Sequence, residues 1–369
     1  MRDDLEAWLR LTLVPGVSPR AQQELLREFK TPQEVLSARG AQIARVVGPE
    51  AGTAFALGAS ESLLERTLAW LEAPDRHLVA LCDSQYPQQL LQLEVPPTVF
   101  YAIGNPDWLA RPAIGVVGSR NATSQGLADA EAFSRALSAA GLTIVSGLAH
   151  GIDAAAHRGG LDGPGSTVAV MGTGPDRIYP RANETLARDI AMNGCLVSEF
   201  ALGTRPAAGN FPRRNRLISG LARAVLVVQA AEESGSLITA RLAAEQGRDV
   251  FAMPGSIHSP LAKGCHKLIK DGAKLVDDVD DILAELGFAP GGAALNRATV
   301  PPHPLLAAMG HDPLTVDEIL ARTGTTFASI AAELSSLEIE GRIEALAGGR
   351  FQQVVARRGV GSSPGRVIE

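Results

Sequence analysis

The chain has 369 residues, of which 46% are hydrophobic and 20% are charged, and its formal net charge is −6. This length allows two or three domains with a large apolar core, and the acidic balance gives no sign of a general affinity for nucleic acid. No apolar run reaches the roughly 18 residues of a membrane span, and the first residues lack a signal-peptide pattern, so we expect a cytoplasmic protein.

The first part of the chain, residues 1 to 75, is predicted to form short helices. Pro15–Gly16 and Gly48–Pro49 interrupt two amphipathic segments at corresponding places. This pattern resembles paired helix–hairpin–helix elements or the related SAM-like bundle. Because acidic residues balance the bases here, a packing or interaction role is favoured over direct contact with DNA.

Residues 76 to 288 alternate between β-rich runs and helical patterns. Nearly continuous apolar strands between helices indicate a Rossmann-like α/β domain, with a parallel sheet covered on both faces. Glycine-rich turns follow most of the strands, and ligands of such sheets bind outside the carboxyl ends of the strands. The predicted strands are 113–118, 142–146, 166–171, 195–200, 224–229 and 249–253.

The segment 289–304 is rich in proline, glycine and alanine, which is typical of a linker. Residues 305–355 then combine two helices, joined at Thr323–Gly324, with a strand–turn–strand unit. Together these elements predict a winged helix. The last residues, 356–369, are expected to form a disordered tail.

The second helix of the predicted winged helix, about 325–340, contains Glu333, Glu338 and Glu340 and neither lysine nor arginine. Phosphates would repel these carboxylates, whereas a winged helix that reads DNA usually places this helix in the major groove. We therefore expect this domain to contact protein, and a duplex-reading transcription factor is disfavoured.

Basic residues are concentrated in two stretches of the otherwise acidic chain. No acid occurs between Glu199 and Glu232, although five arginines fall there, and residues 263–274 combine several bases with the single Asp271. Such stretches give a local cationic surface that suits an anionic ligand. The basic residues are Arg205, Arg213, Arg214, Arg216, Arg223, Lys263, His266, Lys267, Lys270 and Lys274.

Several glycine or serine turns have the form of anion-binding sites. Gly118-Ser119-Arg120 follows a strand and precedes a helix, where free amides and the arginine suit a phosphate. The turns Ser146-Gly147, Gly172-Thr173-Gly174 and Ser234-Gly235-Ser236 are similar, with helix capping as the alternative role of the last. None completes the G-x-G-x-x-G fingerprint, so NAD and other cofactors are not expected.

The sequence offers little support for a metal site. Asp153 and His157 share a helix face, and with His150 they are a conceivable metal or acid–base set. The favoured reading is that Asp153 interacts with the helix N-terminus and His157 with a local carbonyl. Neither a disulfide framework nor a zinc site is indicated by the odd number and wide spacing of Cys82, Cys195 and Cys265.

The most informative stretch is Asn210-Phe211-Pro212-Arg213-Arg214-Asn215-Arg216. Arginines bind phosphates, and the ring of Phe211 offers a face on which a base can stack. Single-stranded nucleic acid exposes such bases, whereas a duplex hides them. We therefore expect Arg214 and Arg216 to act mainly through phosphates and Phe211 through stacking.

Taken together, the motifs VVGSR, SGLAHGIDAAAH, VAVMGTGPDRIYPRAN, SEFALGTRP, NFPRRNRLISGL, SGSLITA and MPGSIHSPLAKG resemble, in order and spacing, the DNA-processing protein A (DprA, or Smf) family. The resemblance covers about residues 110–276. It implies an extended Rossmann fold, often with an N-terminal SAM-like domain and a C-terminal winged helix. It also implies single-stranded DNA binding, homodimerisation and loading of RecA onto DNA during natural transformation, without catalytic activity.

Carried over residue by residue, the resemblance implies phosphate contact by Arg120, base stacking by Phe211, and the Arg-Asn-Arg motif at 214–216, with a looser match at Lys263. The chain departs from many relatives at Ala208, Gln229 and His266. The full candidate DNA-binding set is Gly118, Ser119, Arg120, Ser146, Gly147, Gly172, Asn210, Phe211, Arg213, Arg214, Asn215, Arg216, Ser234, Gly235, Ser236 and Lys263.

The main alternative is a nucleotide-hydrolysing Rossmann enzyme, similar to phosphoribohydrolases of the lysine-decarboxylase-like group. Those enzymes carry a P-G-G-x-G-T-x-x-E signature, whereas the comparable turn here is SGSLITARLAAE, with its glutamate at Glu245. A Walker-type ATPase is disfavoured because no G-x-x-x-x-G-K-[ST] loop occurs.

Overall fold

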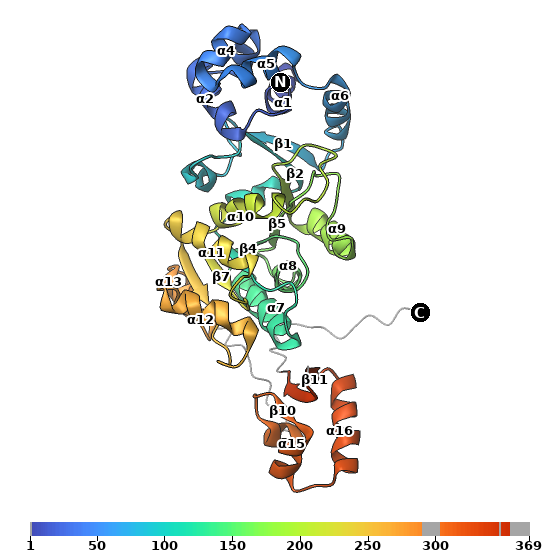
Figure 1. Ribbon diagram of the computed structural model, residues 1–369. Helices are drawn as coiled ribbons and strands as arrows, with labels where there is room; N and C mark the ends of the chain where they lie inside the picture. The colour runs from blue at the N-terminus through green and yellow to red at the C-terminus, as the bar shows by residue number, and fades with distance from the viewer. Residues whose placement is uncertain (1, 290–302, 347, 355–369) are drawn as a thin grey trace, which may run out of the picture.

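The computed structural model describes residues 2–289, 303–346 and 348–354, and it contains a helical N-terminal part, a central α/β part and a small C-terminal part (Figure 1). These three parts confirm the predicted fold class, an α/β domain with a helical N-terminal part and a C-terminal winged helix. Nearly all of the predicted linker at 289–304 and the whole predicted tail at 356–369 lie outside the described residues. No helix in the described part of the chain is long and apolar enough to cross a membrane.

The N-terminal part is a cluster of short helices whose boundaries follow local sequence signals. The hydroxyl of Ser18 accepts a hydrogen bond from the backbone N–H of Ala21, and Gly48, at φ +93°, separates two helices. Leu9 and Leu64 pack with Tyr101 of the central sheet, so the helices share a core with it. The helices are α1 (Arg2–Thr12), α2 (Pro19–Phe29), α3 (Pro32–Ser37), α4 (Gly40–Val47), α5 (Pro49–Leu57) and α6 (Glu61–Trp70).

The central part contains a nine-stranded sheet in the order β1-β2-β6-β5-β4-β3-β7-β8-β9. All six strands predicted from the sequence are present, and the strands from β6 to β9 in this order run parallel. The strands are β1 (Arg76–Ala80), β2 (Val99–Gly104), β3 (Ala113–Val117), β4 (Thr143–Ser146), β5 (Thr167–Val170), β6 (Cys195–Ser198), β7 (Ala224–Val227), β8 (Asp249–Ala252) and β9 (Lys274–Leu275).

One edge of the sheet differs from the predicted parallel arrangement. Strands β1 and β2, which the sequence reading missed, pair antiparallel to each other, and β2 pairs antiparallel to β6. Only the short 3₁₀ turn η1 (Gln88–Gln92), and no α-helix, lies between β1 and β2, so the alternation of strand and α-helix that marks a parallel unit is absent there. The sheet is therefore mixed at one edge.

Helices cover both faces of the sheet, and alternate strand residues point into different cores (Figure 1). Ile144 packs in the core beneath α7 and α8, whereas its neighbour Val145 packs in the core beneath α10 and α11. The helices of the first face are α7 (Ser124–Ala139), α8 (Ile152–Leu161), α9 (Glu184–Asn193) and α13 (Val279–Glu285). Those of the other are α10 (Asn210–Leu221), α11 (Gly235–Glu245) and α12 (Lys263–Lys270), together with the 3₁₀ turn η1 (Gln88–Gln92).

The C-terminal part has the predicted winged-helix architecture. Thr315 and Glu318 form a capping box, and Gly324 ends α15 in the left-handed conformation. The backbone N–H of Ser124, at the start of α7, donates a hydrogen bond of 2.8 Å to the carboxylate of Glu344. The elements are α14 (Pro304–Met309), β10 (Leu314–Thr315), α15 (Val316–Thr323), α16 (Phe327–Ile339), β11 (Ile343–Leu346) and β12 (Arg350–Gln353).

We predict that Gly159→Ala destabilises the central part. A Cβ at this position of α8 would lie 2.1 Å from the backbone oxygen of Glu131 on α7, so the two helices would have to separate. Overpacking of this kind costs about 1–3 kcal/mol, although alanine favours a helix over glycine by about 1 kcal/mol. Thermal melting tests this, with Gly209→Ala as the control because its Cβ would meet nothing within 4 Å. An unchanged melting temperature of Gly159→Ala would contradict the close helix contact.

Candidate nucleic-acid interface

A pocket of about 830 Å³ lies at the carboxyl edge of the parallel strands. The turns after β3, β4, β5, β6 and β7 all contribute to it, as expected for an open α/β sheet. Of the candidate set, the structure brings together in this lining Gly118, Ser119, Arg120, Phe211, Arg214, Asn215, Ser234, Gly235 and Ser236.

The other candidates are not part of the lining. The hydroxyl of Ser146 donates a hydrogen bond of 2.6 Å to the carbonyl of Val116 inside the sheet. The Asn210 side-chain amide donates to the carbonyl of Gly172 at 3.2 Å. Lys263 is exposed at the start of α12. The candidates outside the lining are Ser146, Gly147, Gly172, Asn210, Arg213, Arg216 and Lys263.

In the turn Gly118-Ser119-Arg120, any residue with a side chain at position 118 would clash with its neighbours. A Cβ on Gly118 would lie 2.6 Å from Ile152 Cγ1 and 2.8 Å from the backbone oxygen of Gln229. The side-chain carbonyl of Gln229 also accepts a hydrogen bond from the N–H of Thr123, and its amide donates to the Thr123 hydroxyl. This packing fixes the turn while the side chain of Arg120 stays exposed at the pocket.

Arg214 is the buried cation at the floor of the pocket, with 4% of its surface exposed. Its Nη1 donates hydrogen bonds to the carbonyls of Gly147, at 2.5 Å, and Val170. Burial lowers the pKa of Arg214 to about 10, opposed by the charge of Asp153. The guanidinium therefore remains protonated at neutral pH and contributes positive charge beneath the exposed Arg120.

The metal or acid–base reading of Asp153 and His157 finds no support in the geometry. Asp153 accepts hydrogen bonds from the N–H groups of Gly147 and Ala149, at 3.2 and 3.3 Å. No group of three or more metal-ligating side chains is assembled among the residues that the structure describes. Asp153 thus orders the turn that precedes α8.

His157 is fully buried and has partners on both ring nitrogens. Its Nε2 accepts a hydrogen bond from the N–H of Leu148 at 3.2 Å, and its Nδ1 lies 2.7 Å from the hydroxyl of Thr167. The expected carbonyl partner was therefore wrong, because the ring links a turn amide to a hydroxyl on β5. Burial lowers the pKa of His157 to about 3, so the imidazole is neutral.

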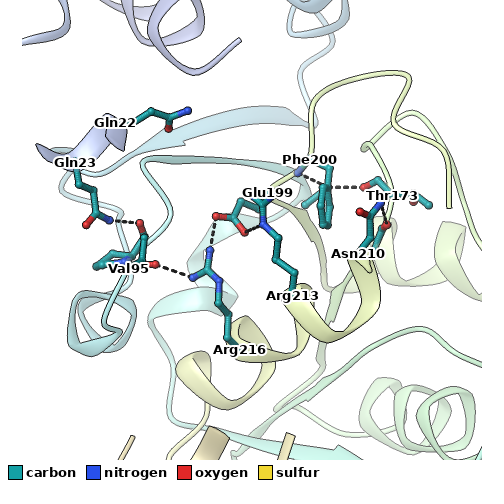
Figure 2. Close-up of polar contacts among 12 residues, drawn as sticks. Gln22, Gln23, Val95, Thr173, Glu199, Phe200, Asn210, Arg213 and Arg216 are labelled. Atoms are coloured by element: carbon teal, nitrogen blue, oxygen red, sulfur yellow. Dashed lines mark hydrogen bonds and ion pairs between the residues drawn. The ribbon is translucent and has the colours of Figure 1, made fainter. Parts of the chain in front are cut away.

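The arginine-rich motif forms the first turns of α10, and its Arg213 and Arg216 both point toward the carboxylate of Glu199 (Figure 2). Arg216 pairs with the carboxylate of Glu199, which is 4% exposed, and donates a hydrogen bond of 2.8 Å to the carbonyl of Val95. Arg213 lies 3.8 Å from the same carboxylate and 5.2 Å from the Phe200 ring. Arg214 and Arg216 are therefore both engaged inside the protein, and their assignment to phosphates stays a prediction.

Two aromatic rings lie at the pocket. The ring centroids of Phe211 and Tyr179 are 5.6 Å apart, and the guanidinium carbon of Arg120 lies 5.4 Å from the centre of the Phe211 ring. A Cβ on Gly172 would come within 2.7 Å of Phe211 Cδ1, so the absence of a side chain at Gly172 leaves room for the Phe211 ring.

The sequence reading missed several lining residues, including Tyr179, Asn121, Asp153 and the loop 206–208. Tyr179 belongs to the motif VAVMGTGPDRIYPRAN. An aromatic residue in a glycine-rich turn after a strand could have indicated a residue of the site. Asp153 was noticed but was not placed at the pocket, because only the fold brings α8 beside the first turn.

An open α/β sheet whose carboxyl edge combines cations, polar turns and aromatic rings defines a protein that binds an anionic ligand with flat rings, as in a nucleotide or a nucleic acid. Comparison with known families makes this specific. The sequence profile described as DNA recombination-mediator protein A matches residues 77–287, and the DprA winged helix domain matches residues 289–349. The chain belongs to the DNA-processing protein A (DprA/Smf) family.

Individual relatives agree with this assignment. Protein Smf of Escherichia coli is 42% identical over 298 residues, which cover 78% of this chain and 80% of the relative. DNA processing protein DprA of Streptococcus pneumoniae is 46% identical over 209 residues, covering 57% of this chain and 74% of the relative.

Two solved structures are also similar. The crystal structure of DprA from Streptococcus pneumoniae matches with a TM-score of 0.68 and 37% identity, covering 77% of this chain and 98% of that one. DprA from Helicobacter pylori, whose structure was described for its single-stranded DNA binding mode, matches with a TM-score of 0.53 and 28% identity, covering 58% of this chain and 98% of that one.

We predict that acid weakens the fold partly through His157. The unfolded chain binds a proton at this residue below about pH 6.5, but the native ring does not until about pH 3. Stability should therefore fall by about 1.4 kcal/mol per pH unit over this window because of His157. In urea unfolding at about pH 5 and about pH 7, His157→Asn should show less pH dependence than the parent, and the exposed-residue control His150→Asn should keep it. Equal pH dependence in His157→Asn and the parent would contradict this account.

Proposed function

We propose that this chain binds single-stranded DNA in the pocket at the carboxyl edge of its central sheet. The observation that carries the proposal is the cluster of Arg120, Phe211 and Tyr179, in which an exposed cation lies beside two aromatic rings. A cation for the backbone and rings for the bases suit a single strand, because its bases are free to stack. The single-stranded DNA binding of the Helicobacter pylori relative supports the same ligand.

The polar turns complete the proposed site. Ser119, Ser234 and Ser236 line the pocket together with the start of α11, where backbone N–H groups favour an anion. Arg214 adds a fixed positive charge at the floor, and Asn215 adds a side-chain amide at the wall. Lys263, exposed at the start of α12, is proposed as an outer phosphate contact.

We further propose, from family membership, that the protein acts in natural transformation in the cytoplasm, forms a homodimer and loads RecA onto the bound strand. The acidic α16 of the winged helix supports a protein-contact role for that domain. An enzymatic role is not proposed, because Glu245 is the last residue of α11, whereas the start of that helix lines the pocket. The hydrolase signature places its glutamate after the turn, three residues beyond its threonine, whereas the glutamate at this pocket, Glu233, precedes the turn.

The first test compares single-stranded with duplex DNA. Fluorescence anisotropy of the full chain should give tighter binding to oligo-dT than to a duplex of matched length, at the same salt concentration. Stacking contributes about 1–3 kcal/mol per base, so a difference of about tenfold is expected from a single lost stack. Equal or tighter binding to the duplex would reject the proposed function.

The second test separates the two kinds of arginine. Arg120→Gln should reduce the slope of log affinity against log salt by about 0.7 for oligo-dT, because one phosphate contact is lost. Arg216→Gln is the comparison variant: because Arg216 is engaged with Glu199, we expect it to change the slope less than Arg120→Gln does and to lower the melting temperature, since buried Glu199 would keep only Arg213, at 3.8 Å, as a partner.

The opposite pattern would assign the phosphate contact differently. If Arg216→Gln reduced the salt slope and Arg120→Gln did not, the strand would follow the Glu199 side of α10 instead of the pocket. Melting curves of both variants exclude unfolding as the cause of any change in affinity.

A further inference from the structure

Tyr179 is the more open of the two aromatic rings at the pocket. It lies on the turn between β5 and the 3₁₀ turn η3 (Arg181–Asn183), with 48% of its surface exposed. Its ring centroid is 5.6 Å from that of Phe211, and the two planes are inclined by 38°. An exposed aromatic side chain of this size in a polar pocket is available to a flat, apolar ligand surface.

Phe211, by contrast, already has close neighbours. Arg120 lies over its ring, Tyr179 lies at the side, and Gly172 is so near that a Cβ there would lie 2.7 Å from Cδ1 and 2.9 Å from Cε1. The ring is only partly exposed as a result. The sequence reading considered Phe211 alone and assumed that a whole face of its ring is open to a base. In the structure, less of that face is open.

We propose that Tyr179 is a second base-stacking residue, so that one base of the strand stacks on Tyr179 while its neighbour lies against Phe211. This inference rests on the proposed function and extends it from one stacking residue to a pair. Arg120, beside the Phe211 ring, is then placed to bind the phosphate that joins the two nucleotides. Stacking on a pair of rings orders two successive bases, which duplex DNA cannot present.

The binding test uses the full chain and oligo-dT. Tyr179→Ala should weaken binding by about fivefold to 150-fold, the equivalent of one lost stack, without changing the salt slope. Tyr179→Phe keeps the ring and should bind like the parent. Met192→Ala is the control, since it removes a side chain that is 72% exposed on α9 and outside the pocket lining.

A packing role for Tyr179 against Phe211 would give other results. Tyr179→Leu retains most of the apolar volume but has no aromatic face. If Tyr179→Leu bound with the parent affinity, or if Tyr179→Ala bound within twofold of the parent, Tyr179 would not be a stacking residue and the inference would be wrong.

A spectroscopic test gives direct evidence of contact. Tyr179→Trp places an indole at the proposed stack, and its emission should be quenched when oligo-dT is added, after subtraction of the parent signal from the three native tryptophans. Met192→Trp should show no quenching. If the parent protein binds oligo-dT but the emission of Tyr179→Trp is not quenched, the inference alone is overturned, whereas failure of the parent to bind would overturn the proposed function itself.

Discussion

The arrangement of the pocket depends on the buried guanidinium of Arg214. Arg214 lies on α10, and its guanidinium donates hydrogen bonds to the carbonyls of Gly147 and Val170. It thereby joins the carboxyl ends of two neighbouring strands, β4 and β5. A Cβ at Gly147 would lie 2.5 Å from the guanidinium, so only glycine leaves room for this contact. Hydrogen bonds and the charge of Asp153 offset the desolvation of the cation, which stays protonated and gives the pocket floor a fixed positive charge.

The arginines of this region serve two separate purposes. Arg120 is exposed at the pocket, where solvent and a ligand can both reach it. Arg216 instead holds Glu199 and the carbonyl of Val95, and the next residue, Pro96, accepts a hydrogen bond from Gln23 of the N-terminal helices (Figure 2). The N-terminal part and the basic helix α10 are thereby connected through one turn of the chain.

The glycine-rich turns were the most reliable part of the sequence reading. Gly118 and Gly172 were selected because glycine lets the backbone approach a ligand closely, whereas in the structure the two glycines leave room for protein side chains, those of Ile152 and Phe211. Ser119, next to Gly118, and Ser236, next to Gly235, line the pocket as well. By contrast, β1 and β2 were missed because they pair antiparallel without an α-helix between them, and β2 joins the parallel strands only through β6, which lies much later in the sequence.

The sequence by itself determined the α/β class, the six strands and the turns at their carboxyl ends, because each of these depends on a local residue pattern. It also determined membership of the family, because the family motifs occur in the expected order. Only the tertiary structure decided which cation serves which purpose. Successive residues of a helix project roughly 100° apart, so Arg214 on α10 turns to Gly147 and Val170, whereas Arg213 and Arg216, three residues apart, share Glu199. The position of each side chain relative to Glu199, Gly147 and the pocket was set by the packing of α10 on the sheet.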